Sequence, residues 1–137
     1  MAVIVDTSVL YALTDRAEAR HEACRAALQA EREAVVIPQP VLSEVCYLIG
    51  SRLGAATEVR FLRGLAESDW RLEPLTSADL DRVVRLLEAY PTANLGYVDA
   101  AVVACAERLK VERIYTFDHR DFGLIRPEHV TAFSLLP

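Results

Sequence analysis

Two short runs of apolar, largely β-branched residues limit most strongly what this chain can fold into. The first is Val3 to Val5 and the second is AVVIP at residues 34–38. A continuous apolar run of this length, without alternation, is typical of a strand buried on both faces of a parallel sheet. Segments with helical spacing follow both runs. This alternation predicts an α/β fold, with an open, mostly parallel β-sheet and helices on both faces.

The rest of the chain continues the alternation. Gly54 divides a long helical stretch into a hairpin, whose second helix places Val59, Leu62 and Leu65 on one face. Ser77 suits the cap of an amphipathic helix, as Thr7 or Ser8 does earlier in the chain. The sequence further predicts helices at residues 18–31, 40–53, 55–67 and 98–109, and strands at residues 2–5, 34–38, 70–75, 113–117 and within 130–136.

Length and composition indicate one compact domain. With 137 residues and 53% hydrophobic side chains, residues 1–137 can bury roughly two-thirds of the surface that the unfolded chain would expose. The start lacks a basic segment followed by a cleavage site, and no apolar run approaches the ~20 residues of a membrane span. We therefore expect a single soluble, cytoplasmic domain. Cys24, Cys46 and Cys105 form no C-x-x-C pair and are expected to fill the core.

The charge pattern argues against one class of nucleic-acid binder and leaves another open. The net charge of −5 argues against a protein that binds nucleic acid through a broad basic surface. An enzyme that gathers acids around divalent cations is compatible with it, because bound metal cancels much of the negative field that a phosphate meets. Among the fifteen basic residues Lys110 is the one lysine, and the rest are arginines.

Four acids, here called the acidic quartet, stand where apolar surroundings are expected. Asp6 and Asp118 follow predicted strands, and the carboxyl ends of parallel strands meet at one edge of a sheet. Glu44 interrupts a helix that is otherwise largely apolar, and Asp99 opens the most apolar helix of the chain. An ionised carboxylate in such surroundings is costly unless an opposite charge compensates it.

Each acid of the quartet also has an ordinary structural explanation. Asp6 could cap the helix after it, and Asp99 could favour the dipole of its own helix. Glu44 could lie on a solvated helix face, and Asp118 could be a turn residue. One shared cause accounts for all four better than four coincidences do. We therefore predict a site for Mg²⁺ or Mn²⁺, which take oxygen ligands and are held by a few carboxylates.

Four motifs occur in order along the chain: IVDTSVL at residues 4–10, SE at 43–44, LGYVDAAVVACAERL at 95–109 and TFDHRDF at 116–122. Together they resemble the PIN-domain ribonucleases, and most of all the VapC-type toxins of bacterial toxin-antitoxin pairs. The resemblance implies a parallel sheet with helices on both sides and metal-dependent endonucleolytic cleavage of RNA. It also implies a homodimer and a cognate antitoxin that covers or fills the active-site groove.

The resemblance assigns roles to single residues as well. The acidic quartet corresponds to the metal-binding acids of the family, and Thr116 to the hydroxyl residue beside them. Thr7 lies in the first motif, where the family often has a hydroxyl residue. Many relatives carry an acid in the loop before the third motif, where this chain reads PTANLG. Asp121 could offset that loss as a ligand of a second metal, or it could only cap a turn. Arg120 and Arg126 could contact phosphate or stay solvated.

Other functions stay open at this point. Aspartate-nucleophile phosphatases need a second Asp two residues after the first, where Ser8 stands, and a lysine near the site. A phospho-accepting receiver domain needs a similar lysine, whereas Lys110 ends a helix. A catalytically silent PIN-like binding partner would keep the fold without cleavage. The helical hairpin of residues 40–67 exposes a face that could pair with a second copy or receive an antitoxin helix.

Overall fold

The two apolar runs form adjacent central strands of a five-stranded sheet in which every pairing is parallel, as predicted. β1 (Ala2–Val5) lies between β2 (Ala34–Pro38) and β4 (Arg113–Tyr115), with β3 (Arg71–Glu73) and β5 (Ser134–Leu136) at the edges. The computed structural model describes residues 1–137 without a gap. All but the first residue of β1 and the first residue of β2 are buried, as strands covered on both faces require.

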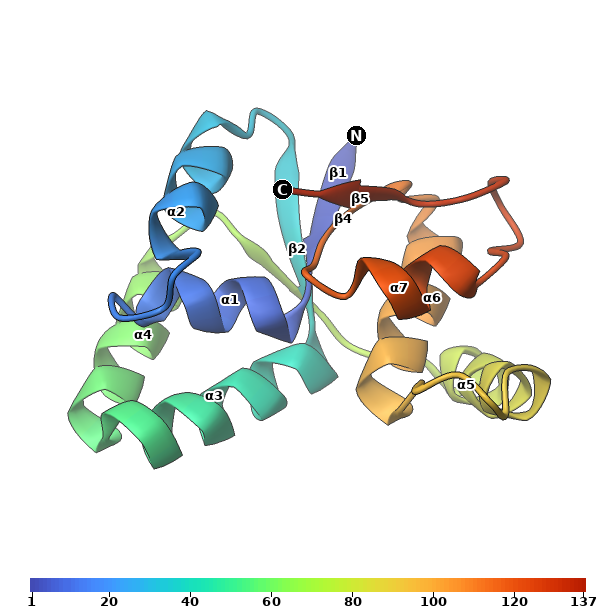
Figure 1. Ribbon diagram of the computed structural model, residues 1–137, viewed down its shortest axis with the longest axis horizontal. Coiled ribbons are helices and arrows are strands. Elements are labelled where there is room, and N and C mark those ends of the chain that lie inside the picture. Colours follow the sequence, from blue (N-terminus) through green and yellow to red (C-terminus); the bar gives the residue numbers. More distant parts are fainter.

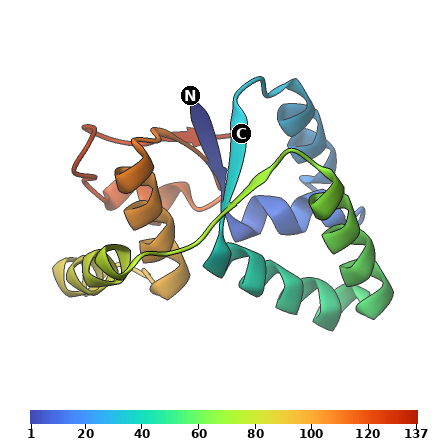
Figure 2. The same ribbon diagram turned by 180° about the vertical axis from the view of Figure 1, so that it is seen from behind.

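Seven helices cover the two faces of the sheet (Figure 1). The first four gather on one side and the other three on the opposite side, a division that Figure 2 shows from behind. One contiguous core of 29 buried side chains forms the interior. None of the helices combines the length and the apolar character that crossing a bilayer requires. The helices are α1 (Thr7–Thr14), α2 (His21–Ala30), α3 (Gln39–Leu53), α4 (Ala55–Glu67), α5 (Ser77–Ala89), α6 (Tyr97–Leu109) and α7 (His119–Leu124).

Several predicted boundaries were wrong by a few residues. The helix expected from residue 18 begins at His21. The cap of α5 is Thr76, one residue before Ser77, because the Thr76 hydroxyl accepts a hydrogen bond from the backbone N of Asp79 at 3.0 Å. Gly54 ends α3 as expected, and its φ of 97° is one that other residues rarely adopt. The short α7 was not predicted, since six residues carry little helical periodicity.

The helical hairpin buries less than expected. α4 packs on the core through Phe61 and Leu65. Of its predicted apolar face, Leu65 is therefore confirmed, whereas Val59 and Leu62 are exposed and were predicted wrongly. α3 buries three residues along one face, and its other face is open. Glu44 lies on that open face and is exposed. The expectation of a largely buried helix around Glu44 was therefore also wrong.

Candidate functional site

The carboxyl ends of the central strands meet where α1 and α3 begin (Figure 1). β1 leads directly into Asp6, and Glu44 lies in the second turn of the helix that follows β2. α6 precedes β4 and runs back along it, so its first turn, with Asp99, lies at the same edge. β4 continues through Thr116 to Asp118. Four separate segments of the chain thus bring the acidic quartet to one edge of the sheet.

Asp6 is the most buried acid of the quartet, with 5% of its surface exposed. Its Oδ2 accepts a hydrogen bond from Thr116 Oγ1 at 2.9 Å, whereas its Oδ1 is buried without a partner. Asp6 occupies the position before α1 that was predicted for Thr7 or Ser8, yet its side chain makes no capping hydrogen bond. The capping explanation for this acid is therefore wrong. Thr7 Oγ1 is also buried without a partner, and unpaired buried oxygens of this kind require an explanation.

Two hydroxyl groups tie the end of β4 to the start of α1. The fully buried Thr116 donates to Asp6 and accepts a hydrogen bond from the backbone N of Asp118 at 3.1 Å. Ser8 Oγ accepts a hydrogen bond from the backbone N of Phe117 at 3.1 Å. Because the Thr116 hydroxyl has a single hydrogen, these two bonds fix its direction toward Asp6. Thr116 therefore positions two members of the quartet at once.

Charges of the acidic quartet raise the pKa of Asp6 and of Asp99. Burial, followed by the charge of Asp6, raises the pKa of Asp99 to about 6. Burial raises the pKa of Asp6, and the charges of Glu44 and Asp118 raise it further. Burial also raises the pKa of Asp118, to which the charge of Asp121 adds. Carboxylates that disfavour one another's charged form in a partly dry setting are typical of sites that bind a cation or a proton.

The quartet does not form a finished ligand shell. No three side chains among the histidines, cysteines and acids are arranged closely enough to hold a metal ion. Asp118 Oδ1 accepts from the backbone N of Asp121 at 3.0 Å and so caps α7, and Asp99 Oδ2 accepts from the backbone N of Gly96 at 3.3 Å. Both acids thus also have local structural roles. The oxygen donors fit Mg²⁺ or Mn²⁺ in type. Asp99 and Asp118 are half-buried beside the buried Asp6, and Glu44 is exposed.

The remaining predicted residues surround α7. Asp121 is buried, with 8% of its surface exposed, and faces Asp118. Arg120 is exposed, and its charge lowers the pKa of Asp118 against the larger effect of burial. Arg126 is exposed and lies at the far end of α7, where its Nη1 donates to the carbonyl of Gly123 at 3.4 Å. Of the two arginines, Arg120 is therefore the one beside the quartet.

No sequence pattern pointed to Arg20, a cation that contacts the segment between β4 and α7. Its guanidinium carbon lies 3.7 Å from the centroid of the Phe117 ring, one residue before Asp118. Such stacking on an aromatic face holds an arginine in place. Arg20 precedes α2 in a loop with no periodicity, and nearly a hundred residues separate it from Phe117 in the chain. No local pattern could have linked the two.

The comparisons with known proteins decide the family. Residues 3–126 match the family model of the PIN domain. The chain belongs to the PIN-domain family. Among characterised sequences, this PIN domain is similar to Ribonuclease VapC26 of Mycobacterium tuberculosis, with 33% identity over 135 residues that cover 98% of this chain and 100% of the relative. The predicted resemblance to VapC-type members is thereby confirmed.

Solved structures share the fold of this PIN domain at lower sequence identity. The crystal structure of VapC20 from Mycobacterium tuberculosis, a toxin that cleaves the sarcin-ricin loop, superposes with a TM-score of 0.81 at 23% identity and covers 86% of this chain and 91% of that one. VapBC2 from Rickettsia felis, bound to promoter DNA, gives a TM-score of 0.73 at 15% identity, with 98% of this chain and 97% of that one covered. These likenesses confirm the predicted fold class.

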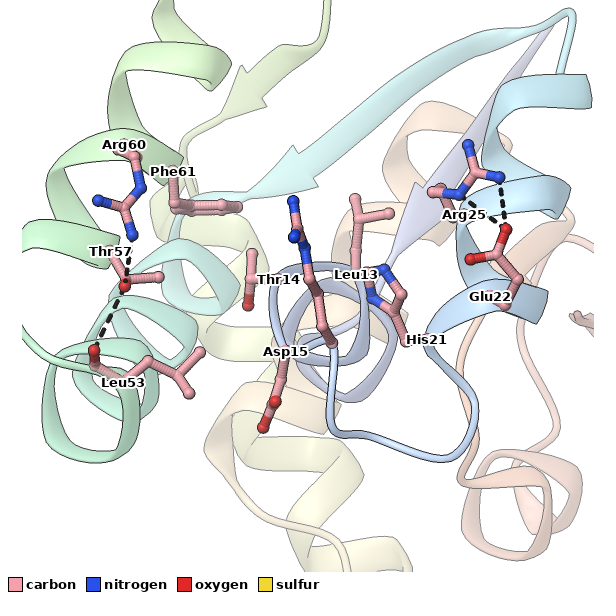
Figure 3. Close-up of a pocket in the computed structure, with 11 residues that line it drawn as sticks. Leu13, Thr14, Asp15, His21, Glu22, Arg25, Leu53, Thr57, Arg60 and Phe61 are labelled. Carbon is pink, nitrogen blue, oxygen red and sulfur yellow. Dashed lines mark hydrogen bonds and ion pairs between the residues drawn. The ribbon is translucent and has the colours of Figure 1, made fainter.

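A second feature of this PIN domain is a groove of about 1160 Å³ between α2 and α4, which no member of the quartet lines. Figure 3 shows Leu13 and Phe61 pointing into it, with Arg60 on the α4 side and Arg25 on the α2 side. Arg16 is a third exposed arginine of its wall. A smaller hollow of about 260 Å³, almost entirely apolar, continues the groove along α4. The groove thus has apolar side chains inside, and its walls carry three arginines together with the acids Asp15 and Glu22, the latter paired with Arg25.

The role of Thr116 in holding Asp6 can be measured directly. Thr116→Val keeps the side-chain shape but leaves a buried carboxylate oxygen without its donor, so the free energy of unfolding is expected to fall by about 1–3 kcal/mol. Thr116→Ser, which keeps the hydroxyl, should lose much less. Urea denaturation at neutral pH checks this. Equal stability of the valine variant and the wild type would contradict the structural role.

Proposed function

We propose that this PIN domain is a metal-dependent endoribonuclease, the toxin of a toxin-antitoxin pair, and that residues 1–137 act as one cytoplasmic domain. The observation that carries the proposal is Asp6, a buried carboxylate with one unpaired oxygen whose charged neighbours are acids. Its place at the carboxyl edge of a parallel sheet is the usual place for a site in such folds. The relative with 33% identity is named a ribonuclease, which supports the same activity here.

The acidic quartet would hold Mg²⁺ or Mn²⁺, with Thr7 and Asp121 as further oxygen donors. Bound there, such an ion supplies Lewis acidity for the hydrolysis of a phosphodiester. The chain contributes the rest: Thr116 orients Asp6 and Asp118, and Asp118 in turn is placed by α7. Arg120 offers a positive charge for an RNA phosphate on the α7 side of the site, where phosphate contacts would position the strand.

Arg20 offers a second such charge: it stacks on Phe117, the residue before Asp118, and pairs with Glu18 at 3.4 Å. Arg126 lies farther along α7 and would meet a more distant phosphate. Single-stranded or looped RNA is the better substrate, because unstacked nucleotides can enter an edge lined by side chains while a rigid duplex cannot.

The alternative enzymes fit less well. A phosphatase or a receiver domain needs a lysine beside the acids. Lys110 caps the end of α6, eleven residues after Asp99, and at 1.5 Å per residue this places it about 16 Å from Asp99 along the helix axis. The catalytically silent binding partner differs from the proposed nuclease only in chemistry, so a cleavage assay separates these two.

The assay incubates the purified chain with single-stranded RNA and Mg²⁺ or Mn²⁺, with EDTA and Asp6→Asn as matched controls. We expect cleavage that needs the metal and whose rate falls at least about 100-fold in Asp6→Asn. Mutating a residue that only supports a metal ligand already lowers metal affinity or activity by about 10–100-fold. Sequencing RNA ends after expression in cells would then name the cut site. Intact RNA in every reaction would contradict the ribonuclease activity and favour the catalytically silent binding partner.

We further propose that the groove between α2 and α4 receives the antitoxin as an amphipathic segment. Solved neighbours include a toxin-antitoxin complex from Klebsiella pneumoniae and VapBC2 from Rickettsia felis, which supports a protein partner of this kind. Leu13 and Phe61 would meet the apolar side of the segment, as in other helix-in-groove complexes. Because the arginines of the groove are exposed, we expect the antitoxin segment to carry acidic residues along the edge of its apolar side.

Charge reversal in the groove tests this assignment. Arg60→Glu is expected to weaken binding of the purified cognate antitoxin by about tenfold or more. Arg63→Glu is the matched control, because Arg63 is exposed on the same helix but does not line the groove. Calorimetry measures both affinities. Equal losses in the two variants would assign the binding to general charge and not to the groove.

A homodimer is also expected from the family resemblance and stays a prediction. Light scattering of the purified chain, with and without the antitoxin, measures the mass directly.

A further inference from the structure

We propose that the hollow between α3 and α6 binds a single unstacked nucleobase of the RNA next to the bond that is cut. This inference rests on the proposed function and adds a substrate subsite to it. The hollow, here called the α3/α6 pocket, has a volume of about 720 Å³. Two tyrosines mark it, Tyr47 on α3 and Tyr97 on α6, and its wall also includes Gln39, Ser43, Leu75 and Val98.

The pocket is continuous with the acidic edge. Glu44, a member of the quartet, forms part of its wall. Tyr97 is the first residue of α6, so it stands in the same helical turn as Asp99. The starts of α3 and α6 lie side by side in both views of the molecule (Figures 1 and 2). A nucleotide whose phosphate meets the quartet therefore has its base within reach of the pocket.

The exposed aromatic rings are what a base would use. Tyr47 is 73% exposed and Tyr97 is 48% exposed, although both carry large apolar rings that folding normally buries. Bases stack on such rings without regard to sequence, because every base has a π-face. Leu75 and Val98 supply apolar contact at the pocket wall, and both pack on the core.

The charges favour a neutral base over a phosphate. No arginine or lysine lines the pocket, and its single charged residue is Glu44. Arg120 acts on Asp118, and Arg20 stacks on Phe117, so both cations belong to the α7 side. Backbone phosphates would therefore follow the α7 side while the base turns into the pocket, where Gln39 and Ser43 offer hydrogen bonds to its polar edge. This geometry needs a nucleotide that is not in a duplex.

Binding of a fluorescent base tests the pocket without cleavage. The probe is a short single-stranded RNA with 2-aminopurine at its centre, and every protein carries Asp6→Asn. Stacking should quench the fluorescence of the base. Tyr47→Ala and Tyr97→Ala should each weaken binding about tenfold and reduce the quenching, whereas the phenylalanine variants of both positions should keep both. Leu80→Ala is the control, because Leu80 is 51% exposed on α5 outside the pocket.

A second probe separates base recognition from backbone contacts. The same RNA with an abasic residue at its centre should bind the protein with intact tyrosines about as weakly as the intact RNA binds the alanine variants. The proposal is overturned if the alanine variants bind both RNAs as the parent does. It is also overturned if they change the molecular mass of the protein in solution but not RNA binding, because the pocket is then an interface between copies.

Cleavage by the protein with intact Asp6 distinguishes failure of this inference from failure of the proposed function. If RNA is cut but the tyrosine variants cut it with unchanged KM, only the base pocket is wrong. If RNA is neither cut nor bound, the ribonuclease itself is wrong and the pocket with it.

Discussion

The Asp99→Asn variant is expected to be more stable than the wild type in the absence of metal while it loses RNA cleavage. Burial and the charge of Asp6 raise the pKa of Asp99 to about 6, so ionised Asp99 destabilises the folded protein at neutral pH. Removing the charge should raise the free energy of unfolding by about 2 kcal/mol, after allowance for solvent screening of a partly exposed group. The melting temperature should rise by roughly 5–10 °C.

The gain should depend on pH in a defined direction. The folded pKa of Asp99, about 6, lies above the value of about 3.9 in an unfolded chain. The folded wild type therefore binds more protons than the unfolded one between these values, and its stability falls as pH rises through this window. The Asp99→Asn variant has no carboxyl group at this position, so its stability should not fall in this way as pH rises. Denaturation in EDTA should show a larger difference between the two proteins at pH 8 than at pH 5.

Asp79 is a matched control for Asp99. Each is the third residue of its helix, and each accepts a hydrogen bond from the backbone N just before that helix. Asp79, however, faces Arg108 at 3.0 Å, whereas the charged neighbours of Asp99 are acids. Asp79→Asn should therefore destabilise the protein. Two variants that shift stability in the same direction would contradict the electrostatic account of the edge.

A second large effect is expected at the start of β4. The Glu31 carboxylate, with 4% of its side chain exposed, accepts two hydrogen bonds from Arg113 at 2.9 Å each and one from Tyr115 at 2.6 Å. Arg113→Met leaves that carboxylate without its cation. Because Arg113 is about a third exposed, we expect the lower part of the usual range for breaking a buried pair, about 3 kcal/mol of stability and roughly 10 °C in melting temperature.

The pH dependence of this second effect has the opposite sign. Arg113 holds the pKa of Glu31 at about 2 in the folded protein, below its ordinary value, so the pair stabilises the fold above about pH 4.3 and the effect is lost as pH falls toward 2. The difference between wild type and Arg113→Met should shrink on acidification. Adding Glu31→Leu to Arg113→Met should recover much of the loss, since no buried charge then remains unpaired. A double variant as unstable as the single one would contradict this reading.

The sequence could predict those helices and strands that are determined by the residue types within the element itself. The β-branched runs at Val3 to Val5 and at residues 34–38 are apolar on both faces, and so they specified central parallel strands. Gly54 specified the break between α3 and α4. The edge strands and α7 are three to six residues long, too short for periodicity to define their ends, and their exact limits depend on pairing and capping.

The site was predictable in its members but not in its geometry. Asp6 and Asp99 could be singled out because each stands against an apolar run, and both have raised pKa values in the structure. Glu44 was singled out for a burial that it does not have. The contact of Arg20 with Phe117 and the α3/α6 pocket depend on segments far apart in the chain, which no local pattern reveals.

Metal binding shows whether the four acids share one cation site. Manganese titrated into the metal-free protein should raise its melting temperature, and a concentration of 100 times Kd should add about 2.7 kcal/mol to the free energy of unfolding. The same titration of Asp6→Asn should leave the melting temperature where it is. A wild type that manganese does not stabilise, or an Asp6→Asn variant that it stabilises equally, would contradict the account.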